Sequence, residues 1–468
     1  MRKLLIVICL FIQSLSSGAQ DSLAYYLDLS TKNNPAVLQK YAEYKASLQK
    51  IPQAASLPDP ELTTGFYLSP MEQVGGKQVA DFRIMQMLPW FGVLRNAKDE
   101  MCLMAKAKYE SYLDAKLQVY YDVQRSVYEI LKLKQDLKIA QQNIDILQTL
   151  ERLAVINFKV SPSGSASNAS SIVIPTASTT TSTSGGMNKM SGSGGKLNLN
   201  AKSSNMSNSP MPSSSGTGLV DVYKVQIEIS DLQNTIEQTK NQVLTLSAQL
   251  NSLLDRPVAT PVALSDTLDL VQLKPEFLAH SDSLLRTNPM LGMIQFEFQS
   301  LEARKQMVTK MGYPMVGFGV NYAMINKSDM SVSPMNGKDM VMPMLTVTLP
   351  LYRKKYKALR DETNFLKSAN VQSFKSAANT LQTEYYQALQ GYRDAQRRIK
   401  LYADQSELTN KSLEIQIRSF GASGISLTEV LAVRQQNLDY QYKRNQAIAD
   451  SNISSAWIMR LMGLRLVN

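Results

Sequence analysis

The chain contains very little histidine and cysteine. His280 is the only histidine among 468 residues, and the two cysteines are Cys9 and Cys102. Zinc centres and most acid–base sites depend on these side chains, so their scarcity argues against such chemistry. No Ser-His-Asp set, phosphate-binding glycine loop or His/Cys cluster is recognisable in the sequence. We therefore predict a protein that is not an enzyme and needs no cofactor.

Long hydrophobic runs are also scarce. Residues 1–19 have the pattern of a secretory signal peptide, with an apolar core at Leu4–Leu15, and we expect the mature chain to begin at Gln20. After this segment, no stretch approaches the ~20 apolar residues of a transmembrane helix. Cys9 lies inside the signal, which leaves Cys102 without an intramolecular disulfide partner. The sequence predicts an exported protein without a helical membrane span.

The charge pattern is mixed rather than clustered. The net charge is +11, from 50 basic and 39 acidic residues. Acids and bases alternate along the predicted helices, which is typical of solvated helix faces. We therefore predict no nucleic-acid partner.

An internal repeat is the strongest positive signal. Asn34-Pro35 and Asn288-Pro289 each open a predicted helix, and Pro60 and Pro314 follow at the same offset from them. Each copy reads helix, strand, strand, long helix, long helix, and a repeat of this kind takes precedence over any local motif. The expected boundaries are 20–255 for repeat 1, 256–275 for a linker and 276–468 for repeat 2.

The long helices carry apolar residues at three- and four-residue spacing. This is the spacing of a coiled-coil seam, and it is most regular in 219–254. The helix at 93–158 would be about 100 Å long at ~1.5 Å per residue. Helices of such length are typical of coiled coils and extended assemblies. The predicted long helices span about 93–158 and 219–254 in repeat 1, and about 354–418 and 427–462 in repeat 2.

Four shorter segments alternate apolar and polar residues with a period of two. Val341, Leu345 and Val347 alternate with Thr346 and Thr348, for example. Such alternation indicates strands with one apolar face. In an exported chain it also fits outer-membrane barrel strands, which are apolar toward lipid and polar toward the lumen. The predicted strands are about 61–68, 77–88, 315–323 and 340–351.

Four strands cannot close a membrane barrel, because barrels begin at about eight strands. An open sheet edge inside lipid is not viable, so several chains would have to share one barrel. Three chains would supply about twelve strands. The alternative from another class of protein is a periplasmic coiled-coil scaffold without a pore, in which two hairpins cap a helical bundle.

A segment rich in Ser, Thr, Gly and Asn interrupts repeat 1 at 159–215. This composition cannot build a packed core, so we expect disorder. Repeat 2 closes the corresponding turn with only Gly421-Ala422-Ser423. The insertion is therefore placed at the helix–helix turn, far from the strands, and we expect the chain to fold without it.

These features together resemble the outer-membrane factor family, the TolC-like channels of tripartite efflux and secretion systems. The resemblance rests on the duplicated plan, on Leu88-Pro89 and Leu349-Pro350 where strands turn into long helices, and on two glycine motifs, Gly216–Val222 and Gly424–Leu431. Proline suits such junctions, because it ends a strand and fits the first turn of a helix. The four expected strand–helix junction residues are Pro60, Pro89, Pro314 and Pro350.

The resemblance implies a mainly α homotrimer with a small β part. A shared barrel of about twelve strands would lie in the outer membrane and continue as a periplasmic α-helical tunnel. The helical tips would meet a periplasmic adaptor and an inner-membrane efflux pump. The expected tip and aperture residues are Gly216, Leu219, Asp221 and Val222 in repeat 1, and Gly424, Leu427, Glu429, Val430 and Leu431 in repeat 2.

The methionines bear on the exported substrate. By alternation, Met340, Met342 and Met344 share the face of the threonines, which is the predicted lumen face. Thioethers are soft ligands suited to Cu(I) or Ag(I), and the second tip resembles the heavy-metal branch of the family. Methionine also serves as flexible apolar filler. Metal ions, drugs and proteins all stay open as substrates.

Overall fold

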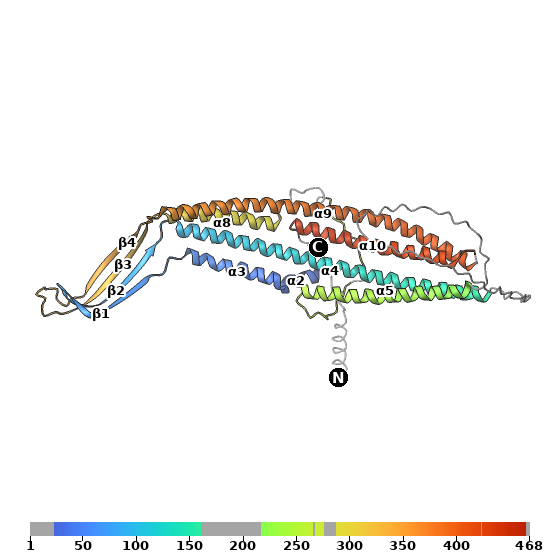
Figure 1. Cartoon of the computed structure of the whole chain (residues 1–468), viewed down its shortest axis with the longest axis horizontal. Coiled ribbons are helices and arrows are strands. Elements are labelled where there is room, and N and C mark those ends of the chain that lie inside the picture. Colours follow the sequence, from blue (N-terminus) through green and yellow to red (C-terminus); the bar gives the residue numbers. More distant parts are fainter. Residues whose placement is uncertain (1–22, 161–216, 265–266, 276–286, 423, 465–468) are drawn as a thin grey trace, which may run out of the picture.

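A four-stranded sheet stands at one end of a long bundle of helices (Figure 1). The computed structural model describes residues 23–160, 217–264, 267–275, 287–422 and 424–464. The predicted signal at 1–19, the insertion from 161 to 215 and Gly216 lie outside the described residues. The sheet and the far helix ends are thus both described, apart from the first glycine of the repeat 1 tip.

Each of the two predicted repeats contains two strands and two long helices, preceded among the described residues by two short helices in the first and one in the second. Repeat 1 runs α2 (Leu23–Asn33), α3 (Pro35–Ala55), β1 (Glu61–Gln73), β2 (Gly76–Leu88), α4 (Val93–Val160) and α5 (Thr217–Leu253). Repeat 2 runs α8 (Pro289–Met311), β3 (Met315–Asn326), β4 (Met340–Thr348), α9 (Arg353–Gly421) and α10 (Leu427–Leu461).

Some strand ends differ from those that alternation indicated. β1 continues past Leu68 to Gln73, because its pairing with β2 resumes at Met71 after a register shift. β3 likewise reaches Asn326 rather than residue 323. β4 ends at Thr348 and not at residue 351, since Pro350 has no N–H with which to continue a ladder.

The four strands form one antiparallel sheet in the order β1-β2-β3-β4. The central pair joins the two repeats, with Lys77 of β2 opposite Asn326 of β3. Directly paired residues place their side chains on the same face, so the register divides the sheet into two surfaces. β1 and β4 are the edge strands.

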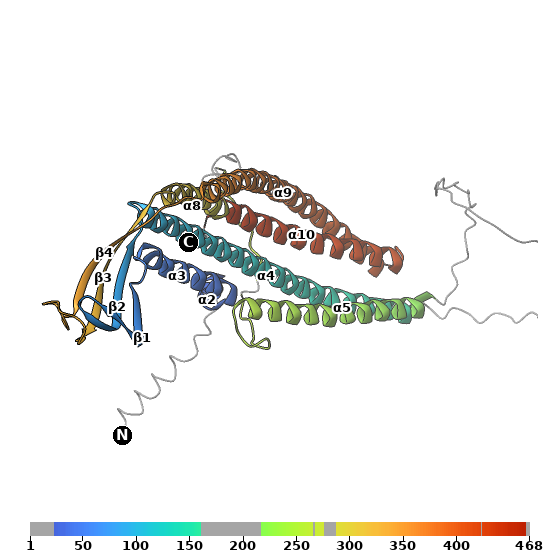
Figure 2. The same ribbon diagram turned by 60° about the vertical axis from the view of Figure 1, so that its left-hand side comes forward.

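α4 is the central helix of the bundle. It packs against α3, α5, α8 and α10, and α10 packs in turn against α9. Figures 1 and 2 show α4 running between the other helices from the sheet to the far end. The buried residues of the described chain form three clusters along this length. None of the helices in the described ranges is long and apolar enough to cross a membrane.

In both Asn-Pro motifs the asparagine caps the helix that the proline begins. The side-chain oxygens of Asn34 and Asn288 each accept a hydrogen bond from the first turn of the helix that follows, at 3.0 and 2.9 Å. Their Nδ2 atoms donate to Leu253 O and Leu461 O respectively, both at 2.8 Å. Each cap therefore ties the start of a short helix to the end of the last long helix in its own repeat.

Candidate functional site

One face of the sheet is apolar and uncovered. We call it the apolar face, and its rows of paired side chains include Leu62, Ile84, Val320 and Pro343 in a single line across all four strands. No described helix packs over the sheet, which extends beyond the bundle (Figure 1). An exposed apolar surface of this kind marks contact with a membrane or a partner. Its exposed members include Leu62, Phe66, Ile84, Phe318, Val320, Val341, Leu345 and Val347.

The opposite face is mostly polar and methionine-rich, and we call it the methionine face. Met340, Met342 and Met344 lie on it with Thr346 and Thr348. Met85 and Met87 of β2 share it because their β3 partners do, and Met315 of β3 lies on it opposite Thr348. Sequence analysis did not single out Met85 and Met87, although their two-residue spacing from Asp81 and Arg83 in β2 was a usable signal. The methionine face comprises Glu61, Thr63, Gly65, Asp81, Arg83, Met85, Met87, Met315, Gly317, Gly319, Asn321, Ala323, Met340, Met342, Met344, Thr346 and Thr348.

All four junction prolines lie where the sheet meets the helices. Pro60 and Pro314 directly precede β1 and β3, and Pro89 and Pro350 follow β2 and β4. The proline positions therefore mark one level of the molecule, the end of the sheet nearest the bundle (Figure 1).

An aromatic cluster lies at the same level. The Trp90 ring stacks on the Tyr313 ring, with 5.4 Å between centroids and 16° between planes. Beside them, Pro89, Pro314 and Phe318 line an apolar groove of about 500 Å³. Aromatic side chains of this kind are enriched at membrane–water interfaces, where one end is apolar and the other wet.

The far end of the bundle holds the predicted tip residues, which fall into two groups. Val222, Leu427 and Val430 are buried in the core cluster that joins the four long helices, and Leu431 packs against that cluster. The three buried side chains are therefore not available to a partner in this conformation. The tip residues that keep exposed or partly exposed surface are Leu219, Asp221, Gly424, Glu429 and Leu431.

The second tip is a tight turn between α9 and α10. Gly424 N donates to Ser419 O at 2.8 Å, and Ser426 caps α10 by accepting from Glu429 N at 3.4 Å. Gly424 is not among the described glycines with a positive φ. An added Cβ there would lie 3.4 Å from the Ser419 carbonyl oxygen, which is an ordinary van der Waals contact, so a small side chain would fit at this position.

Polar contacts connect the two helical hairpins near this end. Lys224 Nζ of α5 lies 3.2 Å from Thr428 Oγ1 of α10, and Asn157 Nδ2 of α4 donates to Phe420 O of α9 at 3.1 Å. An ion pair between the buried Arg434 and the partly exposed Glu228 lies deeper in the bundle. These polar contacts, together with the apolar seam, hold the α4–α5 hairpin against the α9–α10 hairpin near the far end.

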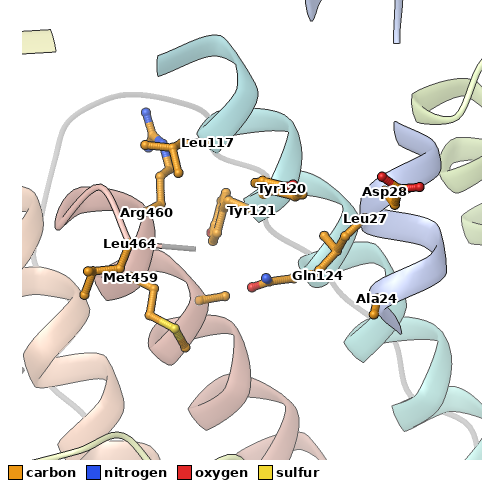
Figure 3. Close-up of a pocket in the computed structure, with 11 residues that line it drawn as sticks. Ala24, Leu27, Asp28, Leu117, Tyr120, Tyr121, Gln124, Met459, Arg460 and Leu464 are labelled. Carbon is orange, nitrogen blue, oxygen red and sulfur yellow. The ribbon is translucent and has the colours of Figure 1, made fainter. Parts of the chain in front are cut away.

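A small cavity of about 120 Å³ lies between α2, α4 and α10 (Figure 3). Leu27, Tyr121 and Met459 line it, and the Arg460 side chain borders it. Its lining is mixed, without a set of convergent acids. In the described part of the chain, no group of three or more His, Cys, Asp or Glu residues could hold a metal ion. The cavity is a feature of helix packing and lies apart from every predicted site residue.

Comparison with known proteins shows similarity in structure rather than in sequence. No protein-family model and no curated protein sequence matches the chain. The structure is similar to CusC, with 12% identity, a TM-score of 0.68 and coverage of 95% of this chain and 92% of CusC. It is similar to the CmeC outer membrane channel of Campylobacter jejuni, with 11% identity, a TM-score of 0.68 and coverage of 94% and 85%.

A third similar structure is the outer membrane protein VceC of Vibrio cholerae, with 10% identity, a TM-score of 0.67 and coverage of 94% of this chain and 96% of VceC. Identities this low establish the fold alone. The chain therefore has the fold of subunits of TolC-like outer-membrane channels, over nearly its whole length.

Proposed function

We propose that this chain is one subunit of a homotrimeric exit duct in the outer membrane. The duct would belong to a tripartite efflux pump, with a periplasmic adaptor at its helical tips and an inner-membrane pump beyond. The observation that carries the proposal is the open sheet, which exposes a complete apolar face and ends in two edge strands without partners in the described chain.

The strand lengths suit a membrane. β1, β2, β3 and β4 contain 13, 13, 12 and 9 residues, and a transmembrane strand needs about 9–11. Lipid tolerates no open sheet edge, so β1 of one copy would have to pair with β4 of the next. Three copies would close a barrel of about twelve strands, with the apolar face toward lipid and the methionine face toward the lumen.

The helices suit a conduit. α4 and α9 contain 68 and 69 residues, so each is about 100 Å long at ~1.5 Å per residue. Helices this long, sealed by an apolar seam and joined directly to the barrel strands, would continue the pore across the periplasm. A coiled-coil scaffold without a pore would share the helices, but it would give no reason for the exposed apolar face of the sheet.

Two neighbouring residues of β4 test the proposal. Leu345 lies on the apolar face and Thr346 on the methionine face. Arginine in a lipid-facing position near the bilayer centre costs about 2–4 kcal/mol, whereas a lumen position tolerates charge. Leu345→Arg should therefore abolish trimer in outer-membrane fractions, and Thr346→Arg should retain it.

Light scattering in detergent should give a trimer, and planar-bilayer recordings should give ion conductance for the wild type and Thr346→Arg. Equal trimer yield from both arginine variants would show that lipid does not cover the apolar face. A stable monomer or dimer that still conducts ions would refute the shared barrel.

The methionine face favours soft metal ions as the exported substrate. Met340, Met342 and Met344 would line the lumen, where thioethers suit Cu(I) or Ag(I) and not hard cations. A drug-efflux or protein-secretion duct of the same fold is the second candidate, since much of the lumen would be shaped by threonine, asparagine and small residues that fit many cargoes.

A further inference from the structure

Three methionines from two strands surround a pair of glycines on the methionine face. Met85 of β2 and Met344 of β4 both pair with Gly319 of the strand between them. One row further toward the helices, Met87 pairs with Gly317. The three thioethers therefore belong to neighbouring positions of one surface, although they come from both repeats of the sequence.

The glycines leave the space that the thioethers need. Strands lie about 4.8 Å apart, so Met85 and Met344 are roughly 10 Å apart at their Cα atoms, with only Gly319 between them. A Cβ on Gly317 would lie 2.5 Å from Met87 Sδ, so the sulfur already occupies the room of the missing side chain. Long, flexible methionine side chains can thus converge above Gly317 and Gly319.

All three methionines are only partly buried, on a face that no described helix covers. Methionine used as core filler would instead be enclosed. Glu61 of β1 pairs with Met85 and places a carboxylate in the same row as Met85 and Met344. Arg83 lies in the next row of the same face and offsets that negative charge, so the neutral sulfurs rather than the local charge would carry the preference for a soft cation.

We propose that Met85, Met87 and Met344 form a thioether site for a soft monovalent cation, Cu(I) or Ag(I). Three neutral sulfurs match the preference of these ions, and each chain would carry one site. The proposal rests on the methionine face being the lumen of the proposed duct. The proposed site uses methionines from both sides of β3 and not only from β4. Gly317 and Gly319 would leave the space that the thioethers occupy.

The experiment uses the full chain in detergent and Ag(I) as the probe. The test variant is Met85→Leu/Met87→Leu/Met344→Leu, in which each swap nearly conserves the volume of the side chain. The matched control is Met290→Leu/Met311→Leu/Met324→Leu, whose methionines are 37%, 41% and 41% exposed and lie on α8 or on the other face of β3. Calorimetric titration measures the affinity and the number of Ag(I) ions bound per chain.

We expect the test variant to lose one Ag(I) per chain, or to bind at least about tenfold more weakly, and the control to match the wild type. NMR of methyl-labelled methionine should show the resonances of these three residues shifting first. Unchanged Ag(I) binding in the test variant would overturn the site.

A second variant covers the case in which the triple variant fails to assemble. In Gly317→Ala the added methyl group meets the flexible end of Met87, and should displace its sulfur and weaken Ag(I) binding while the trimer forms. Wild-type affinity in this variant would also count against the site. Potassium conductance of the wild type separates the two proposals: a conducting trimer that does not bind Ag(I) refutes only the site, and a chain that does not conduct refutes the duct.

Discussion

Arg434 of α10 donates from Nη2 to Glu228 Oε2 of α5 at 2.6 Å, with the arginine side chain 1% and the glutamate side chain 40% exposed. Burial lowers the pKa of the Arg434 guanidinium, and the charge of Glu228 opposes that shift. Nε and Nη1 of Arg434 have no hydrogen-bond partner among the described residues. One ion pair thus links the α4–α5 hairpin to the α9–α10 hairpin.

Removing the glutamate should cost more than removing the pair. Glu228→Ala leaves a buried guanidinium without its counter-charge, and loss of one partner of a buried pair costs about 3–5 kcal/mol. Since Glu228 is partly exposed, we expect the lower end of that range. Adding Arg434→Met should recover most of the loss, because methionine refills the volume without a charge. Thermal unfolding of the purified trimer measures both variants, and equal destabilisation of the single and double variants would contradict this account.

The asparagine caps should be equally important in the two repeats. Asn34→Ala and Asn288→Ala each remove an N-cap and a hydrogen bond to a carbonyl of the neighbouring helix end, at a cost of about 1–2 kcal/mol. Asn33→Ala, one residue before the first cap, is the control and should cost less. Denaturant unfolding gives the three values. If Asn34→Ala were no worse than Asn33→Ala, the cap would not hold the α5 end.

Asp114 of α4 should make stability depend on pH. Burial raises its pKa, and the nearby Arg460 charge lowers it by less. The folded chain therefore favours the protonated carboxyl, so ionised Asp114 costs stability above its folded pKa, and the cost disappears as pH falls toward the unfolded value of about 3.9. Asn cannot ionise, so Asp114→Asn should be more stable than the wild type at pH 7.

The gain from Asp114→Asn should shrink as the pH falls toward 4 and vanish only below the unfolded value of about 3.9, where the wild-type carboxyl is neutral in both states. The melting temperatures of Asp114→Asn and the wild type, compared at pH 4, 5.5 and 7, measure how the gain changes with pH. The exposed Asp145→Asn, on the same helix, is the control and is measured at the same three pH values. A constant difference between Asp114→Asn and the wild type over this range would show that ionisation of Asp114 is not the cause.

A bulky side chain in the second tip should impair efflux at Gly424 but much less at Gly421. Gly424→Trp places a ring beside the Ser419 carbonyl and on the exposed surface proposed for the adaptor. We expect it to abolish most efflux while the trimer still assembles. Gly421→Trp is the matched control, because an added Cβ there meets no atom within 4 Å, and it should retain more efflux. Accumulation of an exported dye at equal trimer level is the readout, and full efflux by Gly424→Trp would remove this turn from the adaptor site.

The sequence by itself determined the order and kind of the elements. Apolar residues repeat every two positions in the strands and every three or four in the helices, and both periods are local properties of the chain. The prolines at 60, 89, 314 and 350 mark the strand–helix junctions for an equally local reason, since proline fixes φ and lacks an N–H. Alternation in β4 likewise put Met340, Met342 and Met344 on one face.

Only the tertiary structure decided which distant residues meet. The registers of β2 and β4 against β3 place Met85 and Met344 on either side of Gly319, and no periodicity specifies a pairing between segments so far apart. The mixed charge pattern of the helices gives no sign that Arg434 differs from the solvated charges around it. Packing of the two hairpins nevertheless buries Arg434 against Glu228. Sequence gives each helix and strand its faces, whereas the contacts between elements, and hence burial, pairing and the candidate site, depend on how those faces are brought together in space.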